Sequence, residues 1–178
     1  MDLKKKIPNY LTGLRFCLIG VFLVFFVTDS YMAALITYMV AWFTDLLDGY
    51  LARKWDAISD KGKLLDPLAD KLLLMTTLIC FYSNRWIDLW ILIVVLVKEL
   101  SLIIGGIILY KRRDVVVYAD TMGKLATGIF GIGVVMTFFY DRVAPYHLYV
   151  FYIALIFAMV AFVQYAYYRI IKPYFLKK

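Results

Sequence analysis

The chain has 178 residues, of which 64% are hydrophobic and 19% charged, and its formal net charge is +7. Soluble domains contain about 45–50% apolar residues, so this composition and the mean hydropathy of +0.79 exclude an ordinary soluble domain. We expect one domain, residues 1–178, whose apolar residues are spread over several membrane spans.

Six apolar segments follow one another along the chain, each close to the roughly 20 residues that cross a bilayer as a helix. No segment shows the alternating polarity of a barrel strand, so we expect an all-α integral membrane protein with six transmembrane helices. The segments are Tyr10–Val27, Tyr31–Leu51, Leu65–Phe81, Leu89–Tyr110, Ala119–Tyr140 and Leu148–Ile170.

The cations between these segments gather on one side of the membrane. If the N-terminus is cytoplasmic, six spans return the C-terminus to the cytoplasm, and only Arg85 and Arg142 remain outside. This asymmetry predicts that both termini face the cytoplasm. The net positive charge then reflects topology and attraction to the anionic lipid of the cell membrane. It does not indicate a nucleic-acid partner.

Cysteine and histidine offer little metal chemistry in this sequence. Cys17 and Cys80 lie in separate apolar segments without a CxxC pattern, and we expect them to be inert packing residues. His147 is the only histidine, and it follows Pro145 and Tyr146 in an expected loop. We therefore expect no metal site built on histidine or thiolate.

Four aspartates lie where the second expected span ends and the third begins. Asp45 and Asp48 are three residues apart, and Asp66 and Asp70 are four apart, so each pair lies on one helix face. A short connection makes the two spans antiparallel neighbours, which predicts that all four carboxylates meet at one depth. Four like charges there require cations, and ligands that are all oxygen favour Mg²⁺ or Mn²⁺.

The residues around the aspartates suit a phosphate group. Gly49 and Gly62 leave room near the backbone, and Arg53 supplies a forked donor that matches phosphate oxygens. Ion pairs at the helix ends are the alternative interpretation, although they explain one carboxylate more readily than four.

The aspartates, glycines and arginine together resemble the signature of the CDP-alcohol phosphatidyltransferases. They match it without a mismatch in the pattern Asp45-x2-Asp48-Gly49-x2-Ala52-Arg53-x8-Gly62-x3-Asp66-x3-Asp70. The resemblance covers the whole chain in layout. It implies six helices, a homodimer, and two divalent ions, Mg²⁺ or Mn²⁺, in a cavity on the cytoplasmic side.

The resemblance also implies roles for single residues. The metal ligands are expected to be Asp45, Asp48, Asp66 and Asp70, and Asp70 is also the expected catalytic base. The CDP-lipid is expected to contact Gly49, Ala52, Arg53 and Gly62. The implied reaction is attack by an acceptor hydroxyl on the lipid-bearing phosphorus of CDP-diacylglycerol, with CMP as the leaving group.

Residues in several of the expected helices bear on the identity of the acceptor. The stretches IPNYLTGLR and LLDPLADKLL resemble the branch of phosphatidylglycerophosphate and cardiolipin synthases. Synthases that use glycerol 3-phosphate usually carry Arg-Glu in the fourth helix, a second arginine two turns later, and Gly-Lys-x-Lys-Thr in the fifth. This chain has Lys98-Glu99, two glycines at the place of that arginine, and GKLAT with Ala126 at the second lysine. The expected acceptor contacts are Arg15, Lys98, Lys124 and Thr127.

Two acceptors and one other class of function stay open. Glycerol 3-phosphate is placed first because it is the commoner acceptor in this branch, whereas the missing cations favour phosphatidylglycerol and thus cardiolipin synthesis. A membrane transporter or assembly protein would also carry charges in its spans. Such a protein would need polar residues through the full depth, and the outer halves of spans one, two, three and six are almost wholly apolar.

Overall fold

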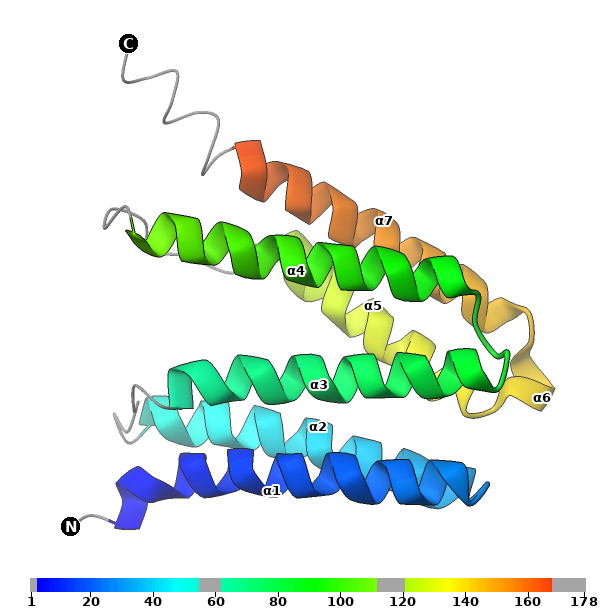
Figure 1. Cartoon of the computed structure of the whole chain (residues 1–178), viewed down its shortest axis with the longest axis horizontal. Helices are drawn as coiled ribbons and strands as arrows, with labels where there is room; N and C mark the ends of the chain where they lie inside the picture. The colour runs from blue at the N-terminus through cyan, green and yellow to red at the C-terminus, as the bar shows by residue number, and fades with distance from the viewer. Residues whose placement is uncertain (1–2, 55–61, 112–120, 168–178) are drawn as a thin grey trace. The chain divides into compact units, whose positions relative to one another are not determined.

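The computed structural model describes residues 3–54, 62–111 and 121–167 (Figure 1). Side chains are described for these residues except 3–9, 46, 48–53, 62–67, 103–111, 121 and 165–166. The described part contains helices joined by short turns and no strand, with the elements α1 (Leu3–Val27), α2 (Tyr31–Lys54), α3 (Gly62–Ser83), α4 (Leu89–Lys111), α5 (Thr121–Thr137), α6 (Tyr140–Val143) and α7 (Tyr146–Ala166).

Contacts group these helices into two compact units, Met1–Asn84 with α1 to α3 and Arg85–Lys178 with α4 to α7. Each of the six apolar segments forms a helix, so the all-α class is confirmed for the described residues. Within them, Tyr10–Val27 and Tyr146–Gln164 are long and apolar enough to cross a membrane. The single domain, the six spans and the orientation stay predictions.

Two boundaries predicted around Pro145 are wrong. α5 ends at Thr137, and the residues after it form the short helix α6 instead of completing the fifth segment. α7 begins at Tyr146, so His147 lies in its first turn and not in a loop. Pro145 is the N-cap of α7. Its missing N–H is harmless there because the first N–H groups of a helix have no partner within it.

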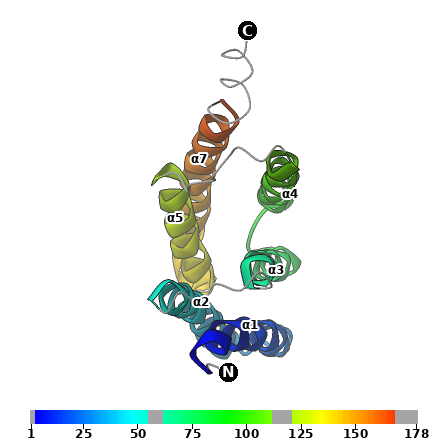
Figure 2. The same cartoon turned by 90° about the vertical axis from the view of Figure 1, so that its left-hand side faces the viewer.

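In the first unit, α1 packs against both α2 and α3, as the nearly end-on view in Figure 2 shows. Its buried residues are spaced three and four apart, which places them in one stripe along the helix. They are Thr12, Arg15, Ile19, Phe22 and Phe26. Fully buried alanines on α2 and α3, namely Ala34, Ala41 and Ala69, let helix backbones approach closely.

The end of this unit at which α1 turns into α2 is held by local hydrogen bonds. Ser30 N–H donates to the carbonyl of Phe25 at 2.9 Å, and Asp29 takes a left-handed conformation with φ of 56°. This is the Schellman arrangement that ends many helices. The Tyr31 hydroxyl donates to the Asp29 carboxylate and accepts from the Asn84 amide at 3.0 Å. The ends of all three helices are therefore tied together.

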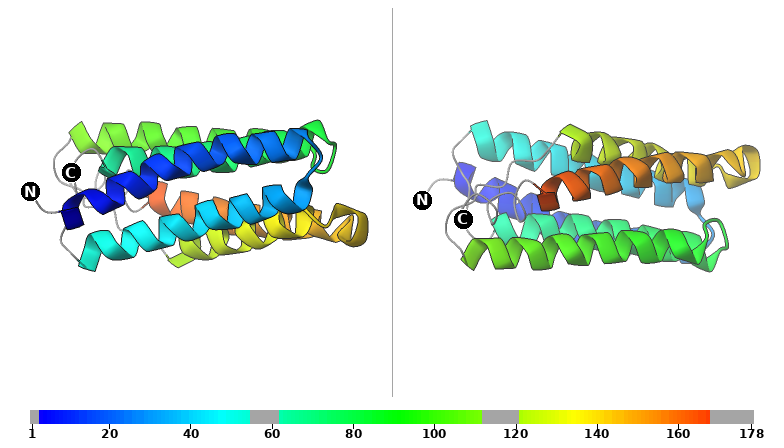
Figure 3. Two further views of the ribbon diagram at one scale, coloured as in Figure 1. Left: turned by 90° about the horizontal axis from the view of Figure 1, so that it is seen from below. Right: turned by 90° about the horizontal axis from the view of Figure 1, so that it is seen from above.

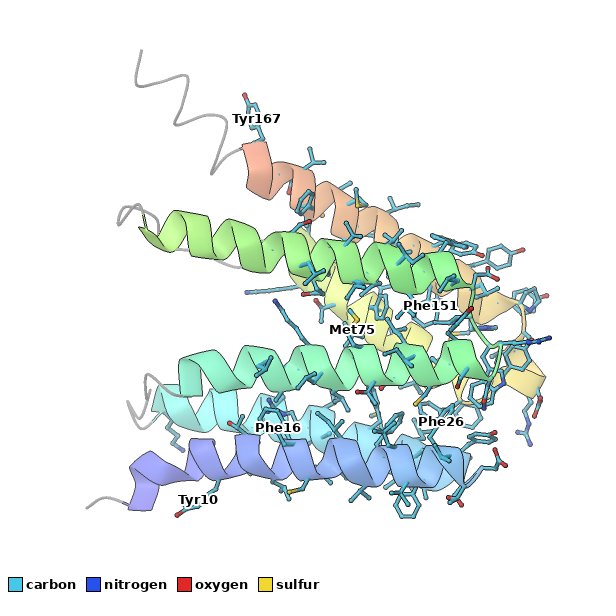
Figure 4. The ribbon with its side chains drawn as sticks, viewed as in Figure 1. Tyr10, Phe16, Phe26, Met75, Phe151 and Tyr167 are labelled. Carbon is cyan, nitrogen blue, oxygen red and sulfur yellow. The ribbon has the colours of Figure 1, made fainter. Side chains whose placement is uncertain are left out.

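In the second unit, α5 and α7 lie side by side (Figure 3). The ring of Phe151, labelled in Figure 4, packs 4.9 Å from the ring of Phe130. α4 joins them through Trp90, whose ring stacks 5.2 Å from that of Tyr152. A Cβ atom added to Gly133 would lie 3.1 Å from the Phe151 ring. A side chain at this position would therefore require the Phe151 ring to shift.

This contact predicts that Gly133→Leu destabilises the second unit. The leucine would push the fully buried Phe151 ring out of place, and overpacking of this kind costs about 1–3 kcal/mol. We expect a lower thermal midpoint of the purified protein in detergent. The matched control is Gly128→Leu on the same helix, where an added Cβ meets nothing within 4 Å. Equal midpoints for the two variants would contradict this account of the packing.

Candidate functional site

The centre of the candidate site is a buried arginine between two aspartates of the predicted motif. Arg15 Nη1 lies 2.8 Å from Asp70 Oδ1, and Arg15 Nη2 lies 3.1 Å from Asp45 Oδ1. The arginine side chain is 0% exposed, whereas the side chains of Asp45 and Asp70 are 34% and 44% exposed. The three residues come from α1, α2 and α3, one from each helix of the first unit.

The packing of the three helices explains how these residues meet. On α2, the buried Tyr38 and Ala41 lead along one face to Thr44 and then Asp45. On α3, Asp70 lies three residues before Leu73 and seven before Thr77, both buried, so it lies on the face that packs inward. Arg15 occupies the buried stripe of α1. The stripes that form the apolar core therefore deliver these charged groups to one place.

The electrostatics of the site follow from its burial. A guanidinium among apolar side chains is costly unless it is paired and hydrogen-bonded. Arg15 donates a charge-assisted hydrogen bond to Asp70 at 2.8 Å, which is the stronger kind of hydrogen bond, and it forms an ion pair with Asp45 at 3.1 Å. Each aspartate keeps part of its surface exposed. The arginine is therefore a fixed internal charge, and each carboxylate is only partly enclosed.

The other aspartates of the motif can be placed by their helices only. Asp48 lies in α2 and Asp66 in α3, but their side chains lie outside the described residues. Among the side chains that are described, no group of three or more His, Cys, Asp or Glu could hold a metal. Asp45 and Asp70 supply carboxylate oxygens, the ligand type that hard divalent cations prefer, so the described half of the motif fits such an ion.

The residues predicted to contact the CDP group also lie outside the described side chains. They are Gly49, Ala52, Arg53 and Gly62, which the backbone places in the last turns of α2 and at the start of α3. Their predicted role stays a prediction.

The remaining residues predicted for the acceptor lie in the second unit. Lys98 Nζ lies 2.8 Å from Glu99 Oε1, and the two side chains are 22% and 13% exposed. Lys124 is exposed in the first turns of α5. The Thr127 hydroxyl donates to the Gly123 carbonyl at 3.0 Å. These positions neither confirm nor contradict a role in acceptor binding.

The contact of Arg15 with the aspartates was missed by the sequence analysis, which placed this arginine in the acceptor site. A signal for it exists in the sequence. Arg15 is three residues after Thr12 and four before Ile19, within the apolar spacing of α1. A cation in the buried stripe of a helix needs an anion on a neighbouring helix, and the motif aspartates are the nearest candidates.

Comparison with known proteins identifies one family and several relatives within it. The family model for CDP-alcohol phosphatidyltransferase matches residues 5–163. Proteins named CDP-diacylglycerol--glycerol-3-phosphate 3-phosphatidyltransferase are 33% identical in Mycoplasma genitalium, over 76% of this chain and 66% of the relative, and 31% identical in Bacillus subtilis, over 68% and 70%. A Streptomyces coelicolor protein named cardiolipin synthase (CMP-forming) is 32% identical over 68% of this chain and 59% of its own length.

Proposed function

The chain belongs to the CDP-alcohol phosphatidyltransferase family, and from this premise we propose that it transfers the phosphatidyl group of CDP-diacylglycerol to glycerol 3-phosphate. The products are phosphatidylglycerophosphate and CMP. The observation that supports this proposal most is the position of Asp45 and Asp70. They are the first and last aspartates of the motif, and Arg15 joins them across two helices.

The four aspartates are proposed to hold two divalent cations, Mg²⁺ or Mn²⁺. The ligand type supports this proposal, because carboxylate oxygens suit these ions. Asp45 and Asp70 lie beside the same buried arginine, and both side chains are partly exposed. When bound, the ions would polarise the diphosphate of CDP-diacylglycerol and offset the charge that develops on CMP. Asp48 and Asp66 are assigned to the same task from their places in the motif.

Asp70 is proposed to take the proton from the acceptor hydroxyl. The hydroxyl oxygen forms a bond to the lipid-bearing phosphorus, and the bond from that phosphorus to the bridging oxygen breaks. CMP leaves with the electron pair. Asp70 is more exposed than Asp45, at 44% against 34%, which suits a carboxylate that must reach a substrate. Gly49, Ala52, Arg53 and Gly62 are assigned to the CDP group by their motif positions.

The acceptor is proposed to contact Lys98, Lys124 and Thr127. The exposed ammonium of Lys124 suits a phosphate oxygen. Lys98 and Glu99 together offer a donor for phosphate and an acceptor for a hydroxyl. Several relatives are named for glycerol 3-phosphate. Phosphatidylglycerol is the second candidate, because one relative is named cardiolipin synthase and Ala126 replaces an expected lysine.

The protein is proposed to cross the cell membrane six times as a homodimer, with both termini and the aspartates on the cytoplasmic side. The apolar spans in α1 and α7 and the one-sided loop cations support this placement. A transporter or assembly protein with the same spans would not release CMP. Release of CMP from CDP-diacylglycerol by the purified protein therefore separates an enzyme from that alternative.

The carboxylates are expected to act through metal. Asp45→Asn should abolish CMP release while the protein stays folded in detergent, because it removes a charged ligand from an oxygen-only site. EDTA should stop the parent enzyme, and added Mg²⁺ or Mn²⁺ should restore it. Asp141→Asn, at an exposed aspartate of α6, serves as the control and should keep full activity. An enzyme that is fully active in EDTA would refute the metal assignment.

The topology can be tested by cysteine labelling from each side of sealed vesicles. In a background with Cys17→Ser and Cys80→Ala, Ser59→Cys should react only from the cytoplasmic side and Asp141→Cys only from outside. The reason is the excess of Lys and Arg in the loops assigned to the cytoplasm. Labelling of Ser59→Cys from outside would reverse the orientation and remove the aspartates from the cytoplasmic face.

The acceptor assignment predicts a selective effect of Lys124→Ala. Loss of a charged hydrogen bond costs roughly 1.5–3 kcal/mol, which is about 10- to 150-fold in kcat/KM. This loss should appear with glycerol 3-phosphate, whereas the KM for CDP-diacylglycerol should stay nearly constant. Arg142→Ala removes an exposed cation from α6 as the control. A parent enzyme that ignores glycerol 3-phosphate and converts phosphatidylglycerol to cardiolipin would replace the first acceptor with the second.

A further inference from the structure

The arginine at the centre of the site joins three helices through one planar group. Its two terminal nitrogens contact one oxygen of each carboxylate, Oδ1 of Asp70 at 2.8 Å and Oδ1 of Asp45 at 3.1 Å. The side chain is wholly buried in the stripe of α1 that packs on α2 and α3. Rotation of either carboxylate would therefore break a contact with a group that cannot follow it.

A guanidinium is suited to this geometry in a way that other cations are not. Its donors lie in a rigid plane and can serve two acceptors at a fixed angle, whereas an ammonium is a point charge on a flexible stem. Metal ligands bind best when their own orientation is set by hydrogen bonds to neighbouring groups. Arg15 supplies such a bond to Asp70 and at the same time pairs with Asp45 at 3.1 Å.

We propose that Arg15 is a positioning residue that orients Asp45 and Asp70 for a divalent cation. This inference rests on the proposed function, since it takes these two aspartates as ligands of Mg²⁺ or Mn²⁺. It removes Arg15 from the acceptor site that the sequence predicted. The arginine touches neither substrate nor ion in this role, and it acts on the ion through the two carboxylates.

Electrostatics and orientation predict opposite effects when the arginine is replaced. A positive charge beside the carboxylates repels a cation, so by charge alone Arg15→Gln would bind Mn²⁺ more tightly. If the arginine orients the ligands, the same variant binds Mn²⁺ more weakly. Arg15→Lys keeps the charge and loses the fork, so orientation predicts weaker binding and charge alone predicts no change. The pair of variants therefore separates the two effects.

The experiment is a titration of the purified full-length protein with Mn²⁺, followed by the electron paramagnetic resonance signal of the free ion. We expect the Kd for Mn²⁺ to rise about 10- to 100-fold in both Arg15→Lys and Arg15→Gln, the range found when groups that orient metal ligands are removed. Arg142→Gln, which removes an exposed cation of α6, should bind Mn²⁺ like the parent. Circular dichroism and gel filtration in detergent check that each variant is folded.

Each outcome decides one question. A parental Kd in Arg15→Lys, or tighter binding in Arg15→Gln, would overturn the positioning role and leave the metal site intact. If the parent itself bound no Mn²⁺, or if Asp45→Asn bound it as the parent does, the metal assignment would fail and the inference with it. If Arg15→Gln does not remain folded, Arg15→Lys carries the test, because it retains the buried charge that faces the aspartates.

Discussion

The first unit is organised around the requirement that a buried cation must have anions beside it. Arg15 lies in the apolar stripe of α1 with no exposed surface. An unpaired charge there would cost several kcal/mol, which is a large part of the stability of a typical domain. The helices can pack only in a register that brings carboxylates to this depth, and Asp45 and Asp70 fill those places. One residue on α1 thereby constrains how α2 and α3 are placed along it.

The two ends of this unit are built on different chemistry. At one end, Asp29, Tyr31 and Asn84 form a local network beside the turn from α1 to α2. Between the ends, aromatic rings fill the seam, with Phe26 5.3 Å from Tyr31 and 6.1 Å from Phe81. Toward the other end of α1, the buried polar residues that the structure describes include Thr12, Arg15 and Thr44, with Asp45 and Asp70 beside the arginine. Folding and site formation are therefore one packing event.

The helices could be predicted from the sequence, because the length and apolar content of a segment indicate a helix that can cross a membrane. Helical spacing and a short connection predicted that the four aspartates meet, and the structure places Asp45 and Asp70 beside one arginine. The contact of both aspartates with Arg15 could not be predicted in this way. Helical spacing relates residues on one helix, whereas Arg15 lies on a different helix, 30 and 55 residues from the two aspartates in sequence. α6 and the first turn of α7 were missed because Pro145 was taken as a sign of a loop, although it begins a helix.

Arg15 differs from Lys98 and Lys124 in how easily its side chain could turn toward a substrate. Arg15 is bound to residues on two other helices, so redirecting it to a substrate would disrupt the packing of α1. Lys98 pairs with its neighbour in sequence, Glu99, and this contact can open without moving a helix. Lys124 is exposed. A cation that must leave its partner in every catalytic cycle should resemble Lys98 or Lys124, which can move without disturbing the packing of a helix. We therefore propose that the arginine orients the proposed metal ligands and that the lysines bind the phosphate of the proposed acceptor.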